Sequence, residues 1–86
     1  MPEISRFLGI VIRMYFLDHD PPHFHATYAG AEAQIRIQPV GLLNGALPPR
    51  ALALVVEWAT IHQAELLDNW RRLHTDEPAA KIAPLE

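Results

Sequence analysis

Alternating apolar and polar residues dominate the first half of the chain and predict β-strands. In segment 7–17, every second residue from Ile10 onward is apolar, and Arg13 and Tyr15 lie between these positions. A strand directs successive side chains to opposite faces, so this segment predicts a first strand with one face on the core. Segments 23–28 and 31–37 alternate in the same way, and the Ala29-Gly30 pair between them is typical of a tight turn.

A period of 3.6 residues replaces the alternation after Pro48-Pro49, which is a suitable start for a helix. From Arg50 to Leu73 the pattern predicts one amphipathic helix of about six turns. His62 lies in the middle of its apolar side, and we predict that it is buried and hydrogen-bonded to the backbone or to Asn69. The apolar positions of this helix are Ala51, Leu52, Val55, Trp58, Ala59, Leu66, Trp70 and Leu73.

These elements predict an α+β fold, in which a three- to four-stranded antiparallel meander packs against one long C-terminal helix. Residues 42–47 would supply the fourth strand. We expect one compact domain over residues 1–74 and a tail over residues 75–86. The helix should cover the apolar face of the sheet and leave the other face exposed to solvent. That second face carries Arg13, Tyr15, His23, His25, Thr27, Glu32, Gln34 and Arg36.

Composition narrows the functional classes. Half of the 86 residues are hydrophobic and 20% are charged, which is typical of a globular domain. There is no cysteine, so disulfides and thiolate metal sites are excluded, and we expect a cytoplasmic protein. No apolar run has the roughly 20 residues of a transmembrane helix, so we expect no membrane partner. A net charge of −3 argues against nonspecific nucleic-acid binding by the whole surface, although one local basic face stays open.

The segment from Asp18 to His25 has the highest concentration of ionisable side chains, with three of the five histidines and two of the ten acidic residues. His23 and His25 are two residues apart, so a strand places both imidazoles on one face. Because imidazole titrates near neutral pH, the pair could act as general acid and base in RNA cleavage without a cofactor. In that reading His23, His25 and Arg13 are catalytic. The residues expected to bind the substrate or a partner are Tyr15, Gln34 and Arg36.

The same histidines allow a metal site as the alternative. His-x-His on a strand can chelate a divalent ion, and the third ligand would be His19, Asp18 or Asp20. We place His19 first in this set. Nitrogen and oxygen ligands without sulfur suit zinc or another divalent transition metal.

Three segments resemble a known bacterial family. They are Gly9-Ile10-Val11-Ile12-Arg13-Met14-Tyr15, Pro21-Pro22-His23-Phe24-His25, and the helical stretch from Arg50 to Trp70. Together they are similar to domain-of-unknown-function family 4160. The resemblance implies a small cytoplasmic protein encoded beside another small protein, in a layout that resembles toxin–antitoxin modules. It assigns no catalytic residue, so the roles given to His23, His25 and Arg13 rest on the pattern alone.

Three functions therefore stay open. The first is a toxin–antitoxin-like component that acts with a small cognate protein, with metal-independent ribonuclease activity if the chain is the toxin. The second is a non-catalytic protein-interaction module, and the third is a small metal-binding protein. Possible partners are the cognate protein, RNA and a second copy of the chain.

Overall fold

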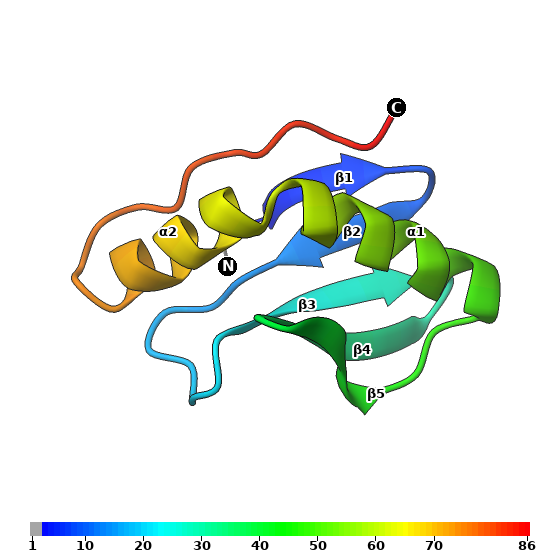
Figure 1. The fold of residues 1–86 in the computed structure, drawn as a ribbon, viewed down its shortest axis with the longest axis horizontal. Coiled ribbons are helices and arrows are strands. Elements are labelled where there is room, and N and C mark those ends of the chain that lie inside the picture. Colours follow the sequence, from blue (N-terminus) through cyan, green and yellow to red (C-terminus); the bar gives the residue numbers. More distant parts are fainter. Residues whose placement is uncertain (1–2) are drawn as a thin grey trace.

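The computed structural model describes residues 3–86, which form five strands and two helices (Figure 1). The strands are β1 (Glu3–Phe7), β2 (Ile10–Arg13), β3 (His23–Tyr28), β4 (Ala31–Ile37) and β5 (Val40–Gly45). The helices are α1 (Pro49–Ile61) and α2 (Gln63–Leu73). Each strand pairs antiparallel with the next in the order β1-β2-β3-β4-β5. The predicted α+β class and the meander are confirmed, and the predicted three to four strands become five.

The first predicted strand is in fact two strands, β1 and β2. Leu8 and Gly9 have φ angles of +51° and +81° and turn the chain between them. Left-handed φ at both central residues is the geometry of a two-residue hairpin turn. The prediction of a single strand over residues 7–17 was wrong, because leucine at position 8 is not a residue type that indicates a turn. Phe16, expected in the core, lies in a loop and is 55% exposed.

The predicted long helix is interrupted at His62, whose φ and ψ of −107° and 25° are not helical. We had expected its imidazole to bond the backbone or Asn69, but its Nδ1 lies 2.6 Å from Glu65 Oε1. Asn69 is buried and exchanges two hydrogen bonds of 2.8 Å with the backbone of Ala80. The predicted contact between His62 and Asn69 is absent because the Asn69 amide bonds the tail instead. A helical wheel shows only residues of the helix and could not predict this contact.

The core lies between the helices and the sheet face that was predicted to be apolar. The tail closes this core, since Ile82 is 4% exposed and its N–H donates to Ile4 O over 2.8 Å. In Figure 1 the tail returns past α2 toward β1. Fully buried side chains of this core include Ile10, Ile12, Met14, Phe24, Ala26, Ile35, Ile37, Val55, Trp58 and Leu66.

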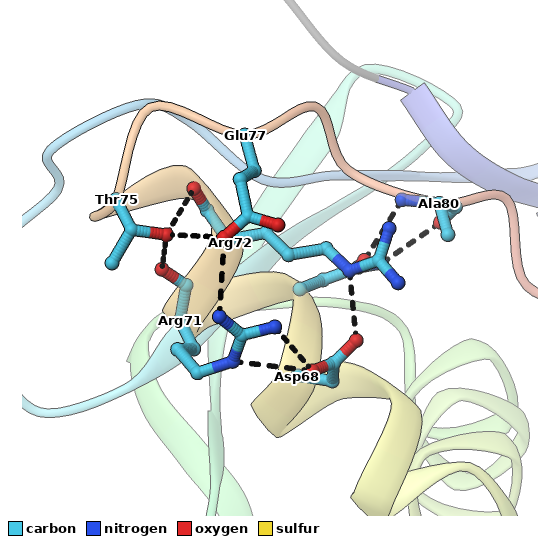
Figure 2. Close-up of polar contacts among 7 residues, drawn as sticks. Asp68, Arg71, Arg72, Thr75, Glu77 and Ala80 are labelled. Carbon is cyan, nitrogen blue, oxygen red and sulfur yellow. Dashed lines mark hydrogen bonds and ion pairs between the residues drawn. The ribbon is translucent and has the colours of Figure 1, made fainter.

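Ionic contacts join the end of α2 to the start of the tail (Figure 2). The Arg71 guanidinium bonds Asp68 Oδ1 at 3.0 Å and Glu77 Oε2 at 3.2 Å. These side chains are exposed, so each pair stabilises the fold by only about 0.2–1 kcal/mol. The Arg71–Asp68 pair lies within α2, and the Arg71–Glu77 pair ties the start of the tail to the end of this helix.

His74, just after α2, connects that helix to the loop between β2 and β3. Its Nδ1 lies 2.7 Å from Trp70 O and its Nε2 lies 2.9 Å from Asp18 O. Both partners are carbonyl oxygens, which only accept, so an imidazolium with two N–H groups satisfies both. These hydrogen bonds, first to Asp18 and then to Trp70, raise the pKa of His74 above its ordinary value. The loop that precedes β3 is therefore held most firmly when His74 is charged.

Gly45→Ala should destabilise the protein more than Gly30→Ala. Both glycines have left-handed φ angles, +77° and +86°, which cost a residue with a Cβ about 1–2 kcal/mol. At Gly45 the new Cβ would also collide with the Glu32 carbonyl oxygen, whereas nothing lies within 4 Å at Gly30. We expect losses of at least about 2 kcal/mol for Gly45→Ala and about 1 kcal/mol for Gly30→Ala in urea unfolding. Equal losses would contradict the close approach of β5 to β4.

His74→Gln should lower stability in acid and have little effect in base. A raised folded pKa means that the stabilisation is complete below the unfolded pKa of about 6.5 and is lost as the pH rises through the higher folded value. Because His74 is exposed and its charge is screened, we expect a difference from wild type of about 0.5 kcal/mol. Urea unfolding of metal-free wild type and variant at pH 5.5 and 8.5 measures it. A gap that is larger at pH 8.5 would refute the assignment.

Candidate functional site

His23 and His25 lie on a part of β3 that is buried on both faces. They are 4% and 9% exposed, so our expectation of a solvent-exposed face is wrong at these two positions. The loop after β2 folds back over them, and its Tyr15 ring meets the His25 ring edge-on with centroids 4.4 Å apart. From the other side, the α2 residue Trp70 lies against His23 at 5.3 Å between centroids.

Asp18, from the same loop, completes a compact group with the two histidines. Its Oδ2 lies 3.1 Å from His23 Nε2 and 3.0 Å from His25 Nε2. One potential ligand atom from each of the three residues lies within 4.8 Å of the others. The Asp18 side chain is 22% exposed, so the group is reached from solvent on the carboxylate side.

The other nitrogen of each imidazole is also occupied. His23 Nδ1 donates to Pro21 O over 2.8 Å, and His25 Nδ1 lies 3.1 Å from Glu32 Oε2. Each ring is thus fixed at Nδ1 by an oxygen, and its Nε2 is directed at Asp18.

Asp18 is held as a carboxylate. Burial by itself would raise its pKa, but the hydrogen bond from His25, the N–H of His19 and the nearby imidazoles together lower the pKa below its ordinary value. The His19 N–H donates to Oδ1 over 3.0 Å, so Oδ2 alone faces the two histidines. The result is a negatively charged oxygen directed at two imidazole nitrogens.

The structure brings together some of the predicted site residues and separates others. His23 and His25 meet as expected, but the exposed His19 is outside the group, and Asp18, our alternative third ligand, takes its place. The backbone N–H of His19 donates to Asp18 Oδ1, while the His19 side chain is exposed. Arg13 and Gln34 flank His25 on the neighbouring strands.

Sequence reasoning missed Glu32 as a partner of His25. The register of β3 and β4 places Glu32 opposite Thr27, two residues from His25 on the same face. Diagonal neighbours on one face are within reach of long side chains. The two-residue turn at Ala29-Gly30 fixes that register, so the contact could have been derived from the turn.

No helix within residues 3–86 is long and apolar enough to cross a membrane. No curated protein and no solved structure matches the chain. The family model for a domain of unknown function, DUF4160, matches residues 9–71, a span that contains Asp18, His23, His25 and Glu32. The chain therefore belongs to the DUF4160 family.

Proposed function

We propose that this protein binds a divalent transition-metal ion through Asp18, His23 and His25. The observation that carries the proposal is the convergence of two imidazole Nε2 atoms on one carboxylate oxygen, at 3.1 and 3.0 Å. Two histidines and one carboxylate are a known ligand set for open metal sites.

The hydrogen bonds of the rings are compatible with a metal ion at this point. Pro21 O is a carbonyl oxygen and Glu32 Oε2 a carboxylate oxygen, so both can only accept, and Nδ1 of each ring carries the proton. A neutral imidazole with its proton on Nδ1 has a lone pair on Nε2. Both lone pairs then face Asp18 Oδ2, and this arrangement is unfavourable unless protons or a metal ion lie among the three atoms.

The distances and the surroundings fit a metal ion. Ligand atoms about 2.1 Å from a shared ion lie about 3.0–3.4 Å apart in octahedral or tetrahedral geometry, which matches the two separations from Asp18 Oδ2. Metal-binding histidines usually donate their second N–H to a backbone carbonyl or a carboxylate. His23 and His25 have one such partner each, Pro21 O and Glu32 Oε2.

Three protein ligands favour a reactive site over a structural one. Structural zinc sites are closed by four protein ligands, whereas catalytic sites leave a position for water or substrate. An ion bound here would supply Lewis acidity or an activated water molecule. The protein's own contribution is to fix the two rings, keep Asp18 ionised and exclude bulk water with Tyr15 and Trp70.

His23→Ala and His25→Ala should each weaken zinc binding by at least about 100-fold, because each removes one of three ligands. Asp18→Asn should weaken it comparably, since it removes the negative ligand and keeps the shape. The measurement is calorimetric titration of tag-free protein with zinc chloride at pH 7.5. We expect binding of one ion per wild-type chain.

His19→Ala and His62→Ala are the matched controls, since each removes a histidine outside the cluster. Both should keep the wild-type zinc affinity. The proposal would be refuted if wild type takes up no zinc, manganese, iron(II) or cobalt. It would also fail if His19→Ala lost as much affinity as His23→Ala while circular dichroism showed all variants folded.

The second candidate is a metal-independent ribonuclease that acts as a toxin–antitoxin-like component with a small partner protein. The observation in its favour is the closeness of the two imidazoles, whose centroids are 5.3 Å apart, with Arg13 directly opposite His25. One ring would accept the proton of the 2′-hydroxyl group and the other would protonate the leaving oxygen.

If this second candidate is correct, the wild type cleaves single-stranded RNA in the presence of EDTA and arrests growth when expressed alone. The folded His23→Ala/His25→Ala variant should lose both activities, whereas His62→Ala should keep them. Gel analysis of a labelled RNA provides the readout. Cleavage that EDTA abolishes would assign the activity to the metal site instead.

A further inference from the structure

One row of opposed residues crosses all five strands through His25. The strand register pairs Glu3 with Arg13, Arg13 with His25, His25 with Gln34, and Gln34 with Asn44. Directly opposed residues share a face of the sheet, so the five side chains form a single row. With neighbouring strands about 4.8 Å apart, Arg13 and Asn44 are separated by roughly 14 Å along the row.

The donors of this row are largely unused. Within residues 3–86, Arg13 forms no ion pair, and its one hydrogen bond is a long contact of 3.4 Å to Thr27 Oγ1. Its opposite neighbour Glu3 is engaged by Arg6 at 2.8 and 3.1 Å. A half-buried guanidinium without a carboxylate partner is a site for an anion.

The amides on the other side of His25 are available as well. In the part of the chain that the structure describes, the Gln34 side chain makes no hydrogen bond, and Asn44 uses only Oδ1, to accept from the Gly45 N–H. Both amide groups border a hollow of about 170 Å³ beside Glu32. Amide N–H₂ groups and arginine are the usual protein donors to phosphate oxygens.

With a divalent ion bound, this face of the sheet would carry a net positive charge, which favours an anionic ligand. The two carboxylates, Asp18 and Glu32, offset the two charges of a divalent ion, and the guanidinium of Arg13 remains. Arg36, opposite His23, adds a second guanidinium that forms no ion pair among residues 3–86. The chain as a whole is negative, so this positive face is a local feature.

We infer that Arg13, Gln34 and Asn44, which flank the buried His25 in this row, bind the phosphodiester backbone of a single-stranded nucleic acid across the sheet. This inference rests on the proposed metal site for the contact between these residues, because an ion held by Asp18, His23 and His25 would offer an open position to a phosphate oxygen from the Asp18 side. Arg13 and the two amides bind phosphate oxygens on either side. An extended ligand with repeated anionic oxygens matches donors spread over roughly 14 Å, which a single carboxylate does not span.

The test is binding of a fluorescent octauridylate to the zinc-loaded protein, with Arg13→Gln and the double variant Gln34→Ala/Asn44→Ala. We expect Arg13→Gln to weaken binding about tenfold, the loss of one charge-assisted contact, and the double variant to weaken it by a similar factor. Arg50→Gln is the matched control, because it removes the same charge from an exposed position at the start of α1, and it should stay within twofold. Zinc affinity, measured in parallel, should be unchanged in every variant.

Two further arms identify the ligand. Octaglutamate should bind at least tenfold more weakly than octauridylate, and equal binding would overturn the inference of a phosphate ligand. Inorganic phosphate should compete with octauridylate only at much higher concentration, and equal affinity for both would refute the extended row. If wild type binds no metal, the proposed metal-binding function is refuted, but the inference about nucleic-acid binding is not. That inference is then tested by whether Arg13→Gln weakens octauridylate binding to the metal-free protein.

Discussion

The contact on which this structure depends is the shared approach of two imidazoles to one oxygen of Asp18. Burying two histidines beside a carboxylate is costly unless every polar atom has a partner. Here the Nδ1 atoms are satisfied by Pro21 and Glu32, and the remaining three atoms converge on a single point. Through Asp18, the loop between β2 and β3 supplies a polar partner for both Nε2 atoms at the place where it excludes water from β3.

The remainder of the fold holds that loop in place. The end of α2 contacts the site twice. The Trp70 ring lies against His23 of β3, and His74, just after the helix, donates a hydrogen bond to the Asp18 carbonyl in the loop. The tail fixes α2 in turn, since Asn69 is bonded to Ala80. A series of hydrogen bonds and packed rings therefore connects the tail near position 80 to the site.

Sequence pattern predicts the parts of this protein that obey a period. Alternation located β3 and β4 and assigned their apolar face. The 3.6-residue period located the helical stretch over residues 50–73, but as one helix where the structure has two. It could not reveal the turn at Leu8, because a left-handed leucine has no compositional signature, nor the break at His62. The burial of His23 and His25 also escaped it, since the covering loop has no periodicity and its position depends on contacts with α2 and Asp18.

The sequence analysis placed His19 beside the two histidines, whereas the structure places Asp18 there. Spacing along the chain therefore does not decide which side chain joins the pair. Both residues lie in the same turn, and either side chain could reach a His-x-His pair from sequence distance alone. The choice is made by a backbone N–H that caps Asp18 Oδ1 and leaves Oδ2 as the only free acceptor of that carboxylate. Which side chain meets the two histidines thus depends less on residue type than on which of its atoms the backbone leaves unsatisfied. The same reasoning marks Arg13 and Gln34, whose side-chain donors have no short hydrogen bond or ion pair within residues 3–86.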